Sequence, residues 1–165
     1  QTCALPISSA AASESFEDAM AAYEAANKSQ EVDHPGYAKA YGIWSALAEE
    51  GDARSLYHVG MLHWFGLGGA HHDQLIALEF FKQAAERDYY VAHSFMGYLY
   101  ERGAGSAFGV DERTALKMWT KGAEAGHCVA VRRLAKAHQK GELGLEVDTE
   151  RASYWKEREG TCLRN

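Results

Sequence analysis

The segment "ALEFFKQAAERDYYVA" at residues 77–92 is followed by a closely similar segment, "ALKMWTKGAEAGHCVA", at residues 115–130. A sequence that repeats itself at a fixed period of about 20–50 residues is typical of solenoids and related arrays. One copy of such a unit cannot bury its own apolar face, so neighbouring copies must stack to form a core. We therefore expect other residues of the chain to recur with the same period.

Three kinds of residue recur with the same period across the chain. The alanines are Ala40, Ala77, Ala115 and Ala152, spaced by 37, 38 and 37 residues. The glycines are Gly66, Gly103 and Gly141, spaced by 37 and 38 residues. The aspartates are Asp73, Asp111 and Asp148, spaced by 38 and 37 residues. The extra residue falls in the segment "GAGSAFGVD", and an insertion confined to a loop is what a helical repeat tolerates.

Each unit predicts two helices. An aspartate precedes the first helix, where it can cap exposed backbone N–H groups and complement the helix dipole. Pairs of large residues follow: Ile43 and Trp44, Phe80 and Phe81, Met118 and Trp119, and in the fourth unit Trp155 and Lys156. We interpret these rings as core residues rather than as a platform for nucleic acid. The turn between the helices is predicted at Gly51, Asp88 and Gly126, where glycine adopts a left-handed backbone at little cost.

The second helix of each unit has its own recurring positions. The apolar register is Val59, Met96 and Leu134, and the residues that follow are Gly60, Gly97 and Ala135. A glycine inside a helix costs about 1 kcal/mol relative to alanine, so its recurrence predicts a close approach to a neighbour. The next shared position is His63, Tyr100 and His138, which suits partly buried sites with one hydrogen-bond partner. We predict that the helix ends at Gly66, Gly103 or Gly141.

These motifs resemble the Sel-one-like repeat family, a tetratricopeptide-like class, over roughly residues 37–160. The resemblance rests on the Ala–large–large–Ala first helix, the Leu-Gly…Tyr type of second helix, and the Gly-x-Gly…Asp loop. It implies an all-α fold, an α-solenoid in which antiparallel helix pairs form a right-handed superhelix. It also implies protein–protein binding in an extended groove. The loop "GELGLEVD" at 141–148 lacks the Gly-x-Gly spacing, which leaves its conformation open.

The chain divides into four segments by composition. Residues 1–7, "QTCALPI", are interpreted as a translated sequencing adapter, the alternative being an ordinary terminus. Residues 8–35 are expected to form a lead-in and a capping helix with Phe16, Met20 and Tyr23 on one face. Residues 36–160 form the array, with units beginning near 37, 74, 112 and 149, and residues 161–165 form a tail. Ala10 and Ala12 fit either a signal-peptidase site or a helix lead-in, so the compartment stays open between periplasm or export and cytoplasm.

Composition limits the partners. The 165-residue chain has a net charge of −6, from 17 basic and 23 acidic residues, which argues against nucleic acid as a partner. No apolar run reaches the roughly 20 residues that span a bilayer. Three cysteines are too few and too scattered for a disulfide scaffold. Because "HCVA" leads into a second helix, Cys128 is predicted to be a packed thiol rather than a nucleophile paired with His127.

The function predicted from the resemblance is a noncatalytic scaffold or adaptor for a protein or peptide partner, acting as a monomer. The first helix of each unit tends to line the concave side in tetratricopeptide-like superhelices. The predicted partner contacts are therefore the exposed-looking charges of these helices: Glu79, Lys82, Glu86, Lys117, Lys121 and Glu124. The alternative is an exported hydrolase or cell-wall-active, β-lactam-binding repeat protein.

The histidines do not change this prediction. His71 and His72 could bind a metal, but a polar loop in which Asp73 caps a helix is favoured, since no further ligands have a recognisable spacing. His93 and His127 are expected to be partly exposed near the turns. We therefore predict no catalytic residue, no metal and no cofactor.

Overall fold

The computed structural model describes residues 14–104 and 108–162. The interpretations of residues 1–7 and of Ala10 and Ala12, and the end of the predicted tail, lie outside these ranges. Within the described ranges the chain forms eight helices and no strand. The helices are α1 (Phe16–Ser29), α2 (Pro35–Glu49), α3 (Ala53–Phe65), α4 (Gln74–Glu86), α5 (Tyr90–Arg102), α6 (Glu112–Glu124), α7 (Cys128–Lys140) and α8 (Thr149–Arg158).

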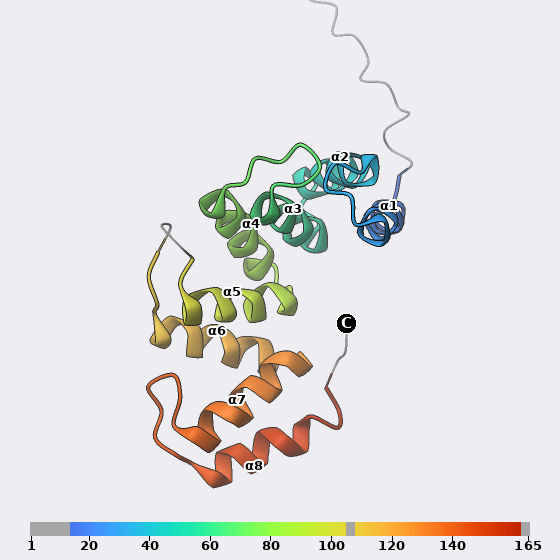
Figure 1. Cartoon of the computed structure of the whole chain (residues 1–165). Helices are drawn as coiled ribbons and strands as arrows, with labels where there is room; N and C mark the ends of the chain where they lie inside the picture. Colours follow the sequence, from blue (N-terminus) through green and yellow to red (C-terminus); the bar gives the residue numbers. More distant parts are fainter. Residues whose placement is uncertain (1–13, 105–107, 163–165) are drawn as a thin grey trace, which may run out of the picture.

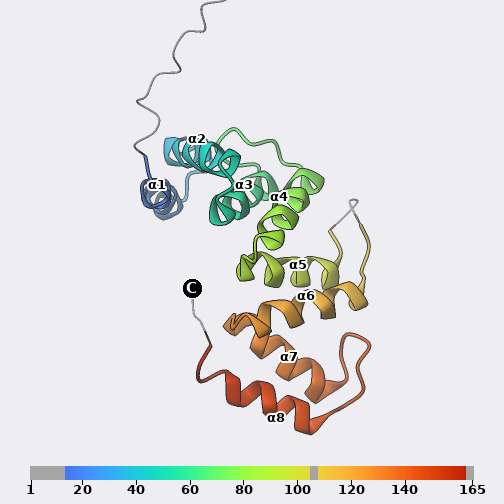
Figure 2. The same cartoon turned by 180° about the vertical axis from the view of Figure 1, so that it is seen from behind.

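The helices stack in chain order and successive helices run antiparallel, so that the whole array bends into an arc (Figures 1 and 2). Each helix packs mainly against its neighbours in sequence. The core is correspondingly divided into three clusters along the arc rather than gathered at one centre. The predicted all-α solenoid is therefore confirmed.

The three recurring aspartates begin helices as predicted. Asp73, Asp111 and Asp148 are the N-caps of α4, α6 and α8, and each side chain accepts a hydrogen bond from a backbone N–H of the first turn. Their own backbone N–H groups make a second repeated contact with the preceding helix. The acceptors are the carbonyl oxygens of His63, Tyr100 and His138, at 3.1, 2.8 and 2.8 Å. Each loop is thus closed at the same two points whatever its length.

The turns also follow the prediction, and the structure defines the conformation of the third loop, which the sequence left open. Asp88 takes a left-handed backbone at φ 59°, as Gly51 and Gly126 do at φ 92° and 90°. In the third loop Leu143 has φ 60°, although a residue with a Cβ pays about 1–2 kcal/mol for that conformation. Leu143 stands two residues after Gly141, as Gly68 stands after Gly66, and it is buried in the core. Burial of its side chain offsets the backbone cost and keeps the loop conformation.

Aromatic rings lie directly on glycine backbone where one unit meets the next. Phe81 from α4 covers Gly60 of α3, and Trp119 from α6 covers Gly97 of α5. A Cβ at Gly97 would lie 2.8 Å from the Trp119 indole, closer than such carbons approach in proteins. The predicted close approach is therefore one between a ring and a helix backbone, and it requires glycine.

Helix α1 covers the first repeat. Its Phe16 and Tyr23 rings lie 5.9 and 5.4 Å from the Trp44 ring of α2. Trp44 is fully buried as a result. Without α1, this side of the indole would be exposed to water.

One cysteine prediction is wrong. Cys128 is not a free packed thiol but forms a disulfide with Cys162, with the two Cα atoms 5.0 Å apart. The bond joins the start of α7 to the segment after α8, across a sequence separation of 34 residues. The spacing could not reveal this pair, because Cys162 lies beyond the last repeated anchor and is brought back only by the antiparallel course of α8.

Replacing Gly97 by alanine should destabilise the fold. The added methyl group must displace the Trp119 ring, and overpacking of this kind costs about 1–3 kcal/mol, partly offset by the roughly 1 kcal/mol gain in helix propensity. The matched control is Gly42→Ala in α2, where no atom lies within 4 Å of the new Cβ. Urea unfolding should show a lower midpoint for the first variant and an equal or higher one for the control. Equal effects at both sites would contradict the contact.

Removing the disulfide should weaken the C-terminal end of the array. Cys162→Ser is the variant of choice because Cys162 is only half-buried, whereas Cys128 is buried. A loop of this length predicts a loss of about 2–4 kcal/mol in the free energy of unfolding. The wild-type protein in reducing buffer should unfold at the same denaturant concentration as the variant. If the reductant leaves the wild-type midpoint unchanged, the bond does not stabilise the folded state.

Candidate partner-binding groove

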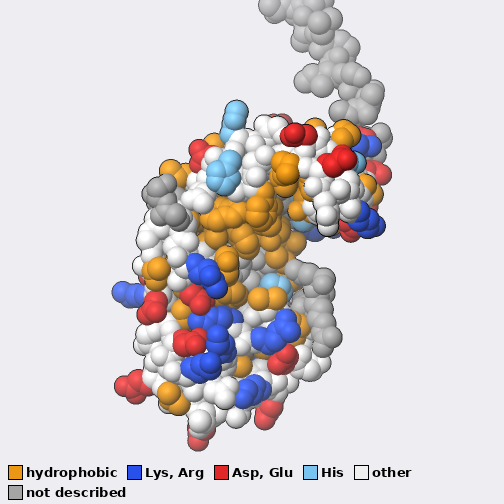
Figure 3. Space-filling model, in the orientation of Figure 1, with side chains coloured by type: hydrophobic (Ala, Val, Ile, Leu, Met, Phe, Trp, Pro, Cys, Tyr) orange, Lys and Arg blue, Asp and Glu red, His pale blue; other side chains and the backbone are white. Residues whose placement is uncertain are grey.

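A largely apolar hollow of the described surface is formed mainly by second helices. Helices α3, α5 and the start of α7, with Trp119 from α6, enclose about 560 Å³, and we call this space the groove. Hydrophobic side chains gather on this face of the molecule (Figure 3). Large apolar patches rimmed by polar residues mark binding sites on soluble proteins.

The floor and the rim of the groove are aromatic. Phe95 of α5 lines the groove, 4.8 Å from the buried Phe81 ring and 6.1 Å from the Trp64 ring, both edge to face. Around it Phe65, Tyr98 and Val129 remain 54%, 43% and 47% exposed. The floor is therefore fixed by the core, while the rim offers apolar surface to a ligand.

A buried polar pair lies on the α7 side of the groove. His127 Nδ1 is 2.6 Å from Ser94 Oγ, and this hydroxyl donates to the Tyr90 carbonyl oxygen at 3.2 Å. Because serine has one hydroxyl proton, His127 Nδ1 is then the donor to Ser94. In a nucleophile–base pair the imidazole would instead take the serine proton. The contact thus joins α5 to the turn before α7.

The expected partial exposure of His93 and His127 is wrong. Their exposed fractions are 7% and 6%. Gly122 of α6 contributes to the burial of His127, because a Cβ there would collide with Ser94 Oγ, the hydrogen-bond partner of this imidazole. Burial, which disfavours the charged imidazolium, lowers the pKa of both histidines.

The six predicted contact residues lie outside the groove. Glu79, Lys82 and Glu86 are on α4, Lys117, Lys121 and Glu124 are on α6, and all are exposed. No ion pair joins any of them among the residues that the structure describes. The sequence did carry a signal for the groove, namely the surplus of aromatic residues in "LYHVGMLHWFG" and "SFMGYLYERG" beyond the core register.

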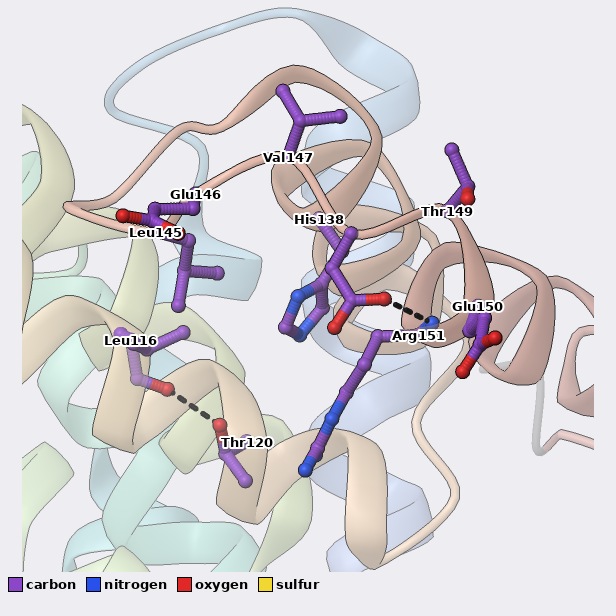
Figure 4. A pocket seen from close by; sticks show the side chains of 10 residues that line it. Leu116, Thr120, His138, Leu145, Glu146, Val147, Thr149, Glu150 and Arg151 are labelled. Carbon is purple, nitrogen blue, oxygen red and sulfur yellow. Dashed lines mark hydrogen bonds between the residues drawn. The ribbon is translucent and has the colours of Figure 1, made fainter.

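A second hollow, of about 700 Å³, lies between α6, α7 and the loop that leads into α8. His138 and Arg151 point into it (Figure 4). Two of its polar side chains, those of Thr120 and Asp148, have structural roles. Thr120 Oγ1 donates to the Leu116 carbonyl oxygen at 2.8 Å, and the Asp148 carboxylate accepts from the Arg151 backbone N–H at 2.8 Å. Burial also lowers the pKa of His138.

The loop with His71 and His72 has a structural role as well. The His71 carbonyl oxygen lies 3.1 Å from Nδ1 of His63, and Asp73 caps α4 as predicted. Across the described residues, no group of three side chains could hold a metal ion. None of the described helices is both long enough and apolar enough to cross a membrane.

Comparison with known proteins identifies the repeat. The family model of the Sel1 repeat matches residues 53–89, 91–127 and 129–157, which is more than half of the chain. The chain belongs to the Sel1 repeat family. Each matched unit begins with a second helix, so that α3 with α4, α5 with α6, and α7 with α8 form the units of this model. Sel1 repeats generally mediate protein–protein interactions, and the family is generally noncatalytic.

Two solved structures share the fold. A Sel1 repeat protein from Oxalobacter formigenes superposes with a TM-score of 0.72 at 23% identity, over 89% of this chain and 58% of that one. The protein c5321, a protective antigen of uropathogenic Escherichia coli with an SLR fold, gives a TM-score of 0.70 at 23% identity, over 91% and 31%.

A curated relative is similar over one segment. The ERAD-associated E3 ubiquitin-protein ligase component HRD3A of Arabidopsis thaliana is 32% identical over 65 residues. These residues are 39% of this chain and 10% of HRD3A. The chain thus spans only a small part of this relative.

Protonation of His58 should destabilise the protein in acid. The imidazole stacks on Trp44 with ring centroids 4.4 Å apart, and burial, with Arg54 nearby, lowers its pKa from 6.5 to about 4. The unfolded chain therefore binds this proton first, and stability is lost as the pH falls from 6.5 towards 4. Between pH 7.5 and 5.0 the loss from this group should be about 2 kcal/mol.

The variant His58→Phe should remove this share of the pH dependence. Urea unfolding at the two pH values measures it, and His72→Gln, at an exposed histidine, is the control. The wild type and the control should lose more stability on acidification than His58→Phe. An unchanged pH dependence in His58→Phe would show that His58 is not held neutral.

Proposed function

We propose that this protein is a noncatalytic scaffold that binds a protein or peptide partner in the groove of α3, α5 and α7. The single observation that carries the proposal is the aromatic rim, where Phe65 and Tyr98 stay exposed beside a hollow with a rigid floor. The family's general role in protein–protein interaction supports it.

The energetics of such a groove favour a peptide-sized anchor. Burial of one large apolar side chain contributes about 1.5–3 kcal/mol, and aromatic residues are common among the few residues that dominate binding. Because Phe95 is held between Phe81 and Trp64, little side-chain freedom is lost when a ligand binds.

The exposed charges of α4 and α6 form a second proposed contact surface. Glu79, Lys82 and Glu86 lie on α4, and the corresponding charges of α6 are Lys117, Lys121 and Glu124. A large partner could reach this surface while anchored in the groove, but the apolar rim gives the groove the stronger claim. The hydrolase alternative has no supporting observation among the described residues: Cys128 is in a disulfide, and Ser94 is bonded to a backbone carbonyl.

The groove can be tested by changing its exposed rim. The variant Phe65→Ser/Tyr98→Ser should lose a partner that the full-length wild type retains from native cell extract, because the apolar anchor site is gone. The matched control is Tyr154→Ser, which removes an equally exposed aromatic residue from α8, outside the groove. A charge-reversed variant of the α4 and α6 residues tests the second surface in the same experiment.

A partner that the groove variant loses and the control retains supports the proposal. Equal retention by the groove variant would contradict it. Loss only from the charge-reversed variant would assign binding to the first-helix surface. Circular dichroism spectra of all variants must match, so that a loss of binding is not a loss of fold.

A further inference from the structure

Equivalent positions on the second helices change chemistry along the array. Phe65 of α3 and Phe95 and Tyr98 of α5 line the groove. At the repeat spacing of 37 and 38 residues their equivalents on α7 are Lys140, Arg133 and Lys136. Positions that are aromatic on α3 and α5 are therefore basic on α7.

Helix α7 contrasts with the rest of the chain in its charge. Between Cys128 and Lys140 it carries Arg132, Arg133, Lys136 and Lys140 and no carboxylate, whereas the whole chain has a net charge of −6. Val129, which lines the groove, lies on the same helical face as Arg132 and Lys136, one and two turns before them. In Figure 3 the hydrophobic area and a group of Lys and Arg side chains adjoin on one face of the molecule.

Part of this positive charge is neutralised within the molecule. Arg133 is largely buried and lies between Glu101, at 2.8 Å, and Glu142, at 2.7 Å. Arg132 and Lys136 make only long pairs, with Glu159 at 3.8 Å and Glu142 at 3.9 Å, and their side chains are more than half exposed. Such exposed pairs contribute little and can exchange partners. Arg102, over the Tyr98 ring, and the exposed Lys140 complete the basic group.

We propose that the groove takes an extended acidic peptide segment whose aromatic or large aliphatic residues lie on α3 and α5 and whose carboxylates lie on α7. This inference rests on the proposed function and names the chemistry of its partner.

The carboxylates of the site favour a peptide over a nucleic acid. Glu101, Glu142 and Glu159 stand among the basic side chains and would repel the phosphates of a continuous nucleic-acid backbone. An acidic peptide carries its charges at separate positions and can place them on Arg132, Lys136 and Lys140. Charge complementarity of this kind sets specificity and association rate more than total affinity.

The test uses full-length protein and fluorescein-labelled peptides in an anisotropy titration. The probe peptide has aromatic residues at one end and glutamates at alternate positions at the other. Its matched versions replace the glutamates by glutamine or by lysine, or the aromatic residues by serine. A labelled oligothymidylate is the nucleic-acid arm. We expect the glutamate peptide to bind about tenfold more tightly than the glutamine peptide at low salt, and less so at high salt.

Two charge-reversed variants test whether the acidic end of the peptide binds to α7. Arg132→Glu/Lys136→Glu should abolish the preference for glutamate and favour the lysine peptide. Arg151→Glu/Lys156→Glu is the control, because it reverses one arginine and one lysine at exposed positions of α8, outside the groove and the second proposed contact surface. Phe65→Ser/Tyr98→Ser should weaken the binding of every peptide that has an aromatic end.

The outcomes separate this inference from the proposed function. Equal binding of the glutamate and glutamine peptides, with sensitivity to Phe65→Ser/Tyr98→Ser, would overturn the acidic partner and keep the groove. An equal loss in both charge-reversed proteins would also overturn it. Tighter binding of oligothymidylate than of any peptide would assign the face to nucleic acid. If folded wild-type protein binds none of the peptides, the acidic-peptide inference is overturned; partner capture tests the groove separately.

Discussion

The contact on which the structure depends is that of an aromatic ring with bare helix backbone. Phe81 on Gly60 and Trp119 on Gly97 set how closely α4 packs on α3 and α6 on α5. This spacing brings α3, α5 and α7 together along one face. Trp119 also lines the groove, and Phe95 packs on Phe81, so the rings that hold the units together also support the candidate binding surface.

The same backbone hydrogen bond closes each loop, whatever the length of the loop. In each unit the aspartate that caps the next helix also donates its backbone N–H to the carbonyl of the preceding helix. The extra residue of the loop before Asp111 therefore does not change where α6 begins. Leu143 shows the same tolerance, because the core burial of its side chain replaces the conformational freedom that glycine supplies in the first loop.

Much of the fold could be predicted from the sequence because the same helix-pair pattern occurs in it several times. Independent anchors gave the helices, the caps and the buried rings, and even the non-glycine turn at Asp88. Features that occur once were missed. The disulfide depends on where the segment after α8 returns, and the burial of His127 depends on its contact with Ser94 and on the missing side chain of Gly122. The groove was missed because helical periodicity does not distinguish an aromatic residue in the core from one on its rim.

The disulfide also determines how the array would respond to tension. If the chain were pulled from its two ends, the force would pass from Cys128 to Cys162 through the covalent bond. Helix α8 and nearly all of α7 lie in the segment between these two cysteines and would carry no tension. Stretching would therefore extend the helices before Cys128 first, while the basic helix α7 stayed folded inside a closed covalent ring.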